Sequence, residues 1–276
     1  MSTNSLAPTI NDWLLSETNR LQKSGIETAR LDCLVLLADE LKHDKAYILA
    51  HPEETLSHTQ LERLHKKVMQ RNKGLPLAYV RGHAEFYGRD FFVNTRVLVP
   101  RPESETIITL LKKLPLPKRC SLLDVGSGSG CLGITAALEI PHSSLSLCDI
   151  DLSTLTVANH NARSHKVVAK YYPSNLLATV PGAYDVLIAN LPYVPVAMPI
   201  NFAASFEPKH ALFAGEDGLD LYRELFEQLE AKDWQPKFLI CESLPNQHQD
   251  LSSIAKACGY QLDQTDDFVQ VFIPAQ

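Results

Sequence analysis

The chain has 276 residues, of which 45% are hydrophobic and 21% charged, and its formal net charge is −6. This balance is that of a globular protein of one or two domains, and it excludes both a disordered chain and nucleic-acid binding driven by overall charge. The N-terminus is polar and no apolar run approaches ~20 residues, so we expect a cytoplasmic protein without a membrane span.

Residues 1–74 are predicted to form a small bundle of helices. One helix begins at Thr9, a strongly apolar second covers Thr28–Ala38, and Ser57 has the residue type of an N-cap for a third. Such short helices cannot bury their apolar faces alone, so they must pack on one another. The inner face of the third helix is expected to carry Leu61, Leu64 and Val68.

A local run of basic residues lies in and after this third helix. We interpret it as a solvated helix face with its linker, and contact with ribosomal RNA or a protein partner is the alternative. The run consists of Arg63, Lys66, Lys67, Arg71, Lys73 and Arg81.

Residues 75–98 are predicted to be a β-hairpin linker. Gly74-Leu75-Pro76 interrupts the helical pattern, because glycine and proline end regular structure. Short strand-like pieces then follow at Ala78–Val80, Glu85–Gly88 and Phe91–Val93.

Residues 99–276 alternate between strand and helix patterns, which predicts a doubly wound α/β domain with a mostly parallel sheet. Strands are expected at 121–125, 144–149, 167–171, 184–190, 237–242, 260–263 and 268–273. Helices are expected at 130–139, 152–163, 219–231 and 247–257.

A glycine-rich turn follows the first strand of this domain and precedes its first helix. Glycines let a ligand approach the backbone closely, and Asp149 ends the second strand, where an acidic residue typically binds ribose hydroxyls. Gly128-x-Gly130-x-x-Gly133 also satisfies the dinucleotide fingerprint, so NAD competes with S-adenosylmethionine. Asp124 favours the latter, because a fixed negative charge suits a sulfonium and opposes a pyrophosphate. The turn consists of Gly126, Ser127, Gly128, Ser129 and Gly130.

Asn190, Leu191, Pro192 and Tyr193 follow the apolar run Tyr184–Ala189, which is predicted to be a buried parallel strand. The asparagine oxygen and the carbonyl before the proline can each accept a hydrogen bond, and the tyrosine offers a flat face. Together they can hold a planar amide or amino group, which predicts chemistry on a planar nitrogen. A loop in which the asparagine caps a turn and the tyrosine fills the core is the alternative.

These two motifs, in this order, resemble those of S-adenosylmethionine methyltransferases that modify amino or amide nitrogens. Further segments are similar to the HemK family, whose members are peptide chain release factor N5-glutamine methyltransferases. The resemblance implies a Rossmann-like class I methyltransferase domain preceded by a small all-helical domain and a β-hairpin linker. The segments are Pro76–Gly82, Glu85–Gly88, Val99–Glu105, Phe206–Leu212 and Gly215–Asp220.

The resemblance also implies a role for each motif. The glycine-rich turn would wrap the methionine end of the cofactor, Asp149 would bind its ribose and Leu176 would flank its adenine. The segment Arg101–Glu105 would lie over the cofactor. The residues that would hold the substrate glutamine, the first of them also beside the cofactor, are Asn190, Leu191, Pro192 and Tyr193.

The chain departs from the family pattern at two positions of this expected site. Leu191 replaces the first of two prolines, which should loosen the backbone but keep the carbonyl acceptor before Pro192. Asn175 stands where the family favours aspartate, and its neutral oxygen can still accept an adenine amino hydrogen.

The implied substrate is the glutamine of the Gly-Gly-Gln loop of class I release factors, which the helical domain of residues 1–74 would grip. We expect a monomer that binds no metal and forms no stable complex with nucleic acid. The alternatives are methylation of a ribosomal-protein glutamine, methylation of adenine N6 in RNA, which Leu191 favours, and a non-catalytic binding module.

Overall fold

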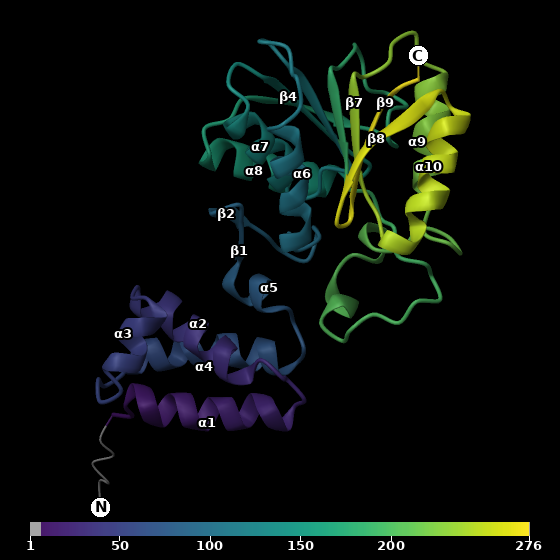
Figure 1. Cartoon of the computed structure of the whole chain (residues 1–276). Coiled ribbons are helices and arrows are strands. Elements are labelled where there is room, and N and C mark those ends of the chain that lie inside the picture. The colour runs from purple at the N-terminus through teal and green to yellow at the C-terminus, as the bar shows by residue number, and fades with distance from the viewer. Residues whose placement is uncertain (1–6, 276) are drawn as a thin grey trace, which may run out of the picture. The chain divides into compact units, whose positions relative to one another are not determined.

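The computed structural model describes residues 7–275, and the chain divides into two compact units. The helical unit contains the chain up to Gly82 together with Asn201–Phe206. The α/β unit contains His83–Ile200 and the chain from Glu207 onward (Figure 1). The helical unit therefore continues beyond the expected boundary at residue 74 and includes a short segment from much later in the chain.

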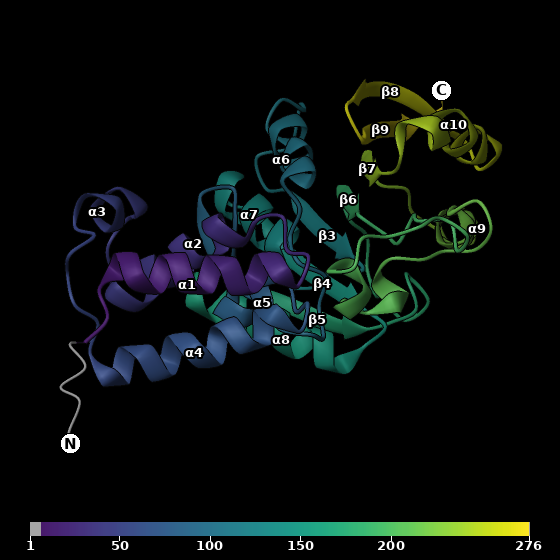
Figure 2. The same cartoon turned by 90° about the horizontal axis from the view of Figure 1, so that it is seen from below.

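The helical unit is held together by an apolar core between α1, α2 and α4, which pack on one another (Figure 2). Ser57 caps α4 as predicted, and Thr9, where the first helix was expected to begin, caps α1. Each forms a reciprocal capping box with the residue three positions later. Leu64 and Val68 are fully buried on the inner face of α4. The helices are α1 (Ile10–Lys23), α2 (Ala29–Leu41), α3 (Lys45–Ala50), α4 (His58–Asn72) and α5 (Leu77–Arg81).

The prediction of a strand at Ala78–Val80 is wrong, because these residues lie in helix α5. Pro76 precedes the helix and Gly82 ends it in the left-handed conformation, with a φ of 79°. Val80 joins the apolar core of the helical unit, so packing overrides the strand preference of this short segment.

Four of the six residues of the basic run form ion pairs within the helical unit, while Arg63, Lys66 and Lys73 are exposed, in part as the predicted solvated face. Arg71 is buried, and its Nε donates to Asp32 Oδ2 of α2 at 2.6 Å. Basic side chains of α4 and α5 thus hold acidic side chains of α2. The other pairs are Arg63 and Lys67 with Glu40, and Arg81 with Asp39.

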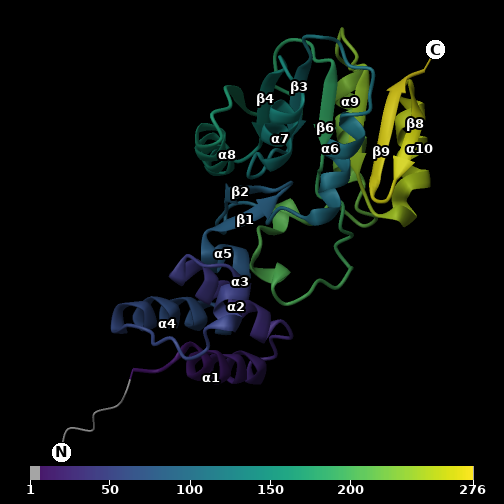
Figure 3. The same cartoon turned by 60° about the vertical axis from the view of Figure 1, so that its left-hand side comes forward.

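The α/β unit begins with the predicted hairpin, β1 (His83–Phe86) and β2 (Arg89–Phe92), and continues with a seven-stranded sheet of order β5-β4-β3-β6-β7-β9-β8. The strands β3 to β7 run parallel, and β9 is antiparallel to both of its neighbours. Figure 3 shows the antiparallel pair β8 and β9. The strands are β3 (Ser121–Val125), β4 (Ser144–Asp149), β5 (Ala169–Pro173), β6 (Val186–Ala189), β7 (Phe238–Glu242), β8 (Tyr260–Asp266) and β9 (Val269–Pro274).

Helices cover both faces of this sheet, because successive residues of each buried strand point to opposite sides. Leu122 of β3 packs with α6, α7 and α8, whereas Leu123 packs with α9 and α10. This confirms the doubly wound α/β fold predicted from the sequence. The helices are α6 (Glu105–Leu111), α7 (Cys131–Glu139), α8 (Leu152–Ser164), α9 (Asp220–Glu230) and α10 (His248–Ala257).

Most element boundaries agree with the prediction to within two residues. Strand β5 begins later than expected, because Lys166 adopts a positive φ of 59° and Val168 is 91% exposed in the turn before it. Helix α6 was not predicted, since it is a short run whose apolar residues, including Ile107 and Leu111, are all buried.

A long loop leaves the α/β unit after β6 and closes on itself. The backbone N–H of Val194 donates to the Leu212 carbonyl at 2.9 Å, and that of Ala214 donates to the Val194 carbonyl at 3.1 Å. We call residues 195–212 the pinned loop. Its segment Asn201–Phe206 belongs to the helical unit, where Phe202 and Phe206 pack edge to face.

Candidate functional site

A cavity of about 440 Å³ lies in the α/β unit, beyond the carboxyl ends of β3, β4 and β6. Strand order reverses between β3 and β6, and open α/β sheets bind ligands at such a switch point. The lining includes Arg96, Val97, Leu98, Gly126, Gly128, Asp149, Ile150, Thr154, Ser174, Asn175, Leu176, Asn190, Leu191, Pro192, His210, Ala211, Phe213, Ala214, Gly215, Asp220 and Leu221.

The glycine-rich turn places Gly126 and Gly128 on the cavity wall, with φ values of 69° and 55°. Only glycine adopts these angles without strain, and a Cβ on Gly126 would lie 3.0 Å from Leu191 Cδ2. Gly130 also has a positive φ, but it packs against α8 and does not line the cavity. Ser127 and Ser129 belong to the turn, but both are buried and neither lines the cavity.

Asp149 ends β4 and lines the cavity. Its Oδ2 accepts from the Gly128 N–H and its Oδ1 from the Asp151 N–H, both at 3.0 Å. Each carboxylate oxygen can accept a second hydrogen bond, so the group retains capacity for ligand hydroxyls. Burial raises the pKa of Asp149, although these two backbone hydrogen bonds oppose the shift.

Asp124 does not line the cavity, so the expected direct action of its charge on a cationic ligand finds no support. The side chain is buried in β3, where its Oδ2 accepts from the Gly133 N–H of α7 at 2.9 Å. Burial raises the pKa of Asp124 to about 7. Its place is structural, joining β3 to the first turn of α7.

The wall near Leu176 is apolar and held under backbone strain. Leu176 is buried with a φ of 49°, which is unusual for a residue with a side chain, and such strain occurs where a structure imposes it for function. The Leu177 N–H donates to Gln228 Oε1 at 2.7 Å and fixes this turn. Asn175 Nδ2 donates to Glu224 Oε1 at 2.6 Å, and within residues 7–275 the Asn175 side-chain oxygen receives no hydrogen bond.

Asn190 follows β6 and lines the same cavity as the glycine-rich turn and Asp149. Its Nδ2 donates to Ser104 Oγ at 2.8 Å and to Glu242 Oε2 at 3.1 Å. The Asn190 oxygen receives no hydrogen bond from the residues that the structure describes. The segment Arg101–Glu105 therefore reaches the site through Ser104.

Leu191 is buried, and its side chain lies against Gly126 on the cavity wall. Its backbone N–H donates to the Tyr222 hydroxyl at 3.4 Å, a bond that a proline at this position could not make. Tyr222 in turn donates to the Ala189 carbonyl at 2.9 Å. This contact restrains the backbone that was expected to be looser than in a sequence with two prolines.

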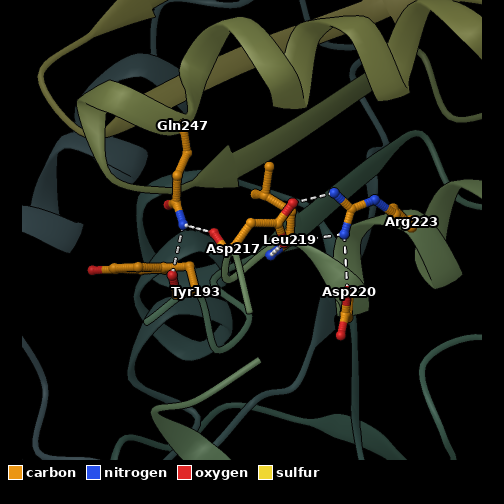
Figure 4. A network of polar contacts seen from close by, with 6 residues as sticks. All are labelled: Tyr193, Asp217, Leu219, Asp220, Arg223 and Gln247. Atoms are coloured by element: carbon orange, nitrogen blue, oxygen red, sulfur yellow. Dashed lines mark hydrogen bonds and ion pairs between the residues drawn. The ribbon is translucent and has the colours of Figure 1, made fainter. Parts of the chain in front are cut away.

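Tyr193 does not line the cavity, but its position is closely determined. Its hydroxyl donates to Glu242 Oε1 at 2.9 Å, and its carbonyl accepts from Gln247 Nε2 at 2.8 Å. Gln247 also donates to the Asp217 carbonyl at 2.7 Å, and Arg223 of α9 holds the Asp217 carboxylate (Figure 4). Burial and the neighbouring Glu242 charge raise the pKa of Tyr193, so the hydroxyl keeps its proton.

Two loops complete the cavity wall, and Glu207 joins them. Its buried carboxylate accepts from the Val99 N–H at 3.0 Å and from Arg101 Nη2 at 2.7 Å. One loop brings Arg96 and the other brings His210 to the wall. The two loops are therefore joined by one ion pair, in which the Glu207 side chain is buried and the Arg101 side chain is 35% exposed.

Sequence reasoning missed Glu242, Tyr222 and Gln247, which hold the site from behind. One signal was present for Glu242, because an acidic residue ends a predicted strand beside the strand that leads to Asn190. Tyr222 and Gln247 gave no such signal, since they meet the site from α9 and from the turn before α10.

Within residues 7–275, no group of three or more histidine, cysteine, aspartate or glutamate side chains is arranged to hold a metal ion. Over the same residues, no helix has both the length and the apolar character needed to cross a membrane.

Two family models match the chain. The PrmC N-terminal domain matches residues 12–82, which lie in the helical unit. The methyltransferase small domain matches residues 105–200, which include the glycine-rich turn and Asn190.

Relatives named release factor glutamine methyltransferase match most of the chain. The protein from Koribacter versatilis is 36% identical over 220 residues, covering 78% of this chain and 79% of the relative. The protein from Moorella thermoacetica is 33% identical and covers 91% of both chains. Among solved structures, the catalytic domain of hMettl16 in complex with a 3′UTR hairpin has a TM-score of 0.51 at 13% identity. It covers 79% of this chain and 82% of that one, and shows the fold alone.

Proposed function

The chain belongs to the release factor glutamine methyltransferases, and from this membership we propose that it methylates a glutamine of class I peptide chain release factors. The methyl group comes from S-adenosylmethionine and goes to the side-chain amide nitrogen (N5) of the glutamine in the Gly-Gly-Gln motif. The enzyme is a protein-(glutamine-N5) methyltransferase with the Rossmann-like class I fold.

The observation that carries this proposal is the meeting of two motifs in one cavity. Gly126, Gly128 and Asp149 line the same cavity as Asn190, Leu191 and Pro192. A cofactor held by the first group and an amide held by the second are therefore neighbours, which is what a transfer between them requires.

The residues present fit S-adenosylmethionine. A cavity of about 440 Å³ lies within the usual size range of small-molecule sites. Asp149 can accept ribose hydroxyls, and the apolar wall of Ile150 and Leu176 suits an adenine ring. Asp149 and Asp220 also bring two carboxylates to the wall, which favours a cation over a pyrophosphate.

When bound, S-adenosylmethionine supplies an electrophilic methyl group on its sulfonium. The task of the protein is then to orient the glutamine and to raise the electron density on its nitrogen, because amide resonance makes that nitrogen a poor nucleophile. Asn190 Oδ1 and the Leu191 carbonyl would accept the two amide hydrogens. Tyr193 would stabilise the loop that aims the amide.

The helical unit is proposed to grip the release factor, and with such a substrate the enzyme works in the cytoplasm. We further propose that it acts as a monomer without stable nucleic-acid binding, which the internal pairing of Arg63, Lys67 and Arg71 supports. Light scattering and an RNA-binding assay at physiological salt test these two points. A stable dimer or submicromolar RNA binding would contradict them.

The decisive variant is Asn190→Ala, assayed by mass spectrometry of the Gly-Gly-Gln peptide after incubation with S-adenosylmethionine and class I release factors. Loss of one acceptor should lower kcat by about 100-fold or more, with a smaller change in cofactor affinity. Asn159→Ala, on α8 outside the cavity lining, should behave as the wild type.

Parallel reactions with ribosomal proteins and ribosomal RNA separate the alternatives. Methyl transfer by the wild type to either of them, with none to the release factor glutamine, would overturn the proposed substrate. Near-normal turnover by Asn190→Ala would instead overturn the role of this residue.

A further inference from the structure

Glu242 is the last residue of β7, and its buried carboxylate lies directly behind the proposed catalytic segment. Its side chain connects two members of that segment, because Oε2 accepts from Asn190 Nδ2 at 3.1 Å and Oε1 accepts from the Tyr193 hydroxyl at 2.9 Å. The residue is 1% exposed and does not line the cavity. It therefore cannot touch a ligand, and any effect on the reaction must pass through its two partners.

The contact with Asn190 decides which end of the asparagine amide faces the cavity. An ionised carboxylate only accepts hydrogen bonds, so the NH2 group of Asn190 must point to Glu242. Asn190 Nδ2 also donates to Ser104 Oγ at 2.8 Å, so both hydrogens of the amide have acceptors outside the cavity. The oxygen is left for the ligand.

This orientation matters because the opposite one would defeat the reaction. An Asn190 flipped by 180° would present its NH2 group to the NH2 group of the glutamine, donor against donor. No hydrogen of the glutamine amide would then be accepted by this side chain, and its nitrogen would gain no electron density. The oxygen and NH2 ends of the Asn190 amide have nearly the same size and shape, so packing alone cannot enforce the choice.

The backbone around Glu242 is equally well fixed. The Tyr222 hydroxyl lies within hydrogen-bond distance of the Glu242 and Ala189 carbonyls, and its single proton is shared between them, so it links the ends of β7 and β6. This link helps to hold Glu242 beside Asn190, which follows β6 directly.

We propose that Glu242 is a positioning residue for methyl transfer, which sets the orientation of the Asn190 amide and restrains Tyr193 from behind the cavity wall. The inference rests on the proposed function, since it concerns the acceptance of a glutamine amide by Asn190. It assigns a role in turnover to a residue that never meets cofactor or substrate.

Glu242 acts as a pure acceptor only while it is ionised. Burial raises the pKa of this carboxyl, with hydrogen bonds from Ser104 and Tyr193 opposing the shift. The other titratable groups that face it are Glu103, Cys131 and Tyr222, and Glu103 raises the pKa further. Because the folded pKa is raised, kcat should fall as the pH decreases through it, when the added proton allows the Asn190 amide to flip.

The test is a donor–acceptor exchange between residues 190 and 242. Asn190→Asp places two carboxylates side by side, and we expect kcat to fall by about 100-fold. Adding Glu242→Gln returns a donor opposite the new acceptor, with almost no change of shape. The kcat of the double variant should be at least about ten times that of Asn190→Asp, so that the effects of the two substitutions are not additive.

Single variants at Glu242 complete the design. Glu242→Gln should lower kcat, leave KM for S-adenosylmethionine nearly unchanged and lack the acid-side step of the wild-type pH profile. Glu224→Gln is the contrast, because Glu224 holds Asn175 in the same manner at the other end of the cavity. It should raise KM for S-adenosylmethionine and spare kcat.

Strictly additive effects in the double variant, or an unchanged pH profile in Glu242→Gln, would overturn the positioning role. Calorimetric binding of S-adenosylmethionine to each variant shows that the site is folded independently of turnover. If the wild type itself transfers no methyl group to the release factor glutamine while binding the cofactor, the proposed function fails, and this outcome is distinct from a failure at Glu242.

Discussion

At the scale of single residues, Asp124 shows how a buried carboxyl group that never faces the ligand can support a site. Its carboxyl group is 1% exposed, and it joins β3 to α7 through the Gly133 N–H. Burial raises its pKa to about 7, so in the folded chain the group is largely protonated below neutral pH, whereas in the unfolded chain it is ionised above about 4.

The free energy of unfolding should therefore fall as the pH rises from about 4 to 7, by a total of about 4 kcal/mol, and then level off. Asp124→Asn removes this dependence and should be more stable than the wild type at pH 8. The measurement is urea unfolding at pH 5 and pH 8 in a Trp13→Phe background, where Trp234 reports the α/β unit alone.

Asp185→Asn serves as the control for this experiment. Hydrogen bonds from Ser121 and contact with Lys237 lower the pKa of Asp185, so its linkage to stability lies below pH 4. The slope between pH 5 and pH 8 should stay that of the wild type. An equal slope in Asp124→Asn would contradict the assignment to Asp124.

The residues of the site were predictable to different degrees. Gly126, Asp149 and Asn190 could be placed together from the sequence, because the carboxyl ends of parallel strands meet at one edge of the sheet. Glu242 and Gln247 could not, since their importance lies in which atom of a neighbour they hold. Such pairings arise from tertiary packing and leave no periodic trace in the sequence.

At the scale of elements, the helical unit depends on a buried ion pair between α2 and α4. Arg71 Nε donates to Asp32 Oδ2, and its Nη1 donates to the Leu75 carbonyl at 3.2 Å, which also fixes the turn before α5. The side chains of the pair are 11% and 5% exposed. Breaking a buried pair leaves an uncompensated charge, which costs more than the pair itself contributes.

Arg71→Met should accordingly destabilise the helical unit by about 3 to 5 kcal/mol. Arg63→Met is a matched control in the same helix, because Arg63 is 64% exposed and its contact with Glu40 should contribute less than about 1 kcal/mol. Thermal unfolding in a Trp234→Phe background, with Trp13 as the reporter, measures both. Equal losses in the two variants would refute the distinction.

Elements were predictable where their pattern was long. Thr9 and Ser57 marked the starts of α1 and α4 in the sequence, and both helices extend over several turns of regular apolar spacing. Tyr79 and Val80 were assigned to a strand because three residues cannot distinguish a period of 2 from one of 3.6. The helix is favoured by the burial of both residues, with Val80 in the core of the helical unit, and this burial depends on tertiary packing.

At the scale of the whole molecule, the chain passes between the two units more than once. Asn201–Phe206 returns to the helical unit, where Gly74 has a φ of 99°. A Cβ on Gly74 would lie 2.2 Å from Phe202 Cε1 and 2.8 Å from Phe206 Cε2, so both rings would have to move. No sequence pattern indicated this return, because it joins segments far apart in the chain.

Gly74→Ala should raise KM for the intact release factor severalfold, because the displaced segment carries Phe202, a 69% exposed residue of the helical unit that is proposed to grip the release factor. The value of kcat and the affinity for S-adenosylmethionine should remain unchanged, since the base of the pinned loop is held by its own hydrogen bonds. Gly25→Ala is the matched control in the same unit, with a φ of 78° and no atom within 4 Å of the added Cβ. Steady-state kinetics measure KM for the release factor in both variants. Similar increases in KM would show that backbone strain alone causes the effect.

The closure of the pinned loop at Val194, Leu212 and Ala214 has a consequence for how such enzymes diverge. Because hydrogen bonds hold the two ends of the loop together, the entropic cost of closing it grows only slowly with its length. Insertions and deletions within the loop should therefore change stability little. Natural variation can change residues 195–206 while Asn190, its supports and the site residues Glu207 and His210 stay constant. Related enzymes can thus come to act on different protein substrates while they keep the same methyl-transfer chemistry.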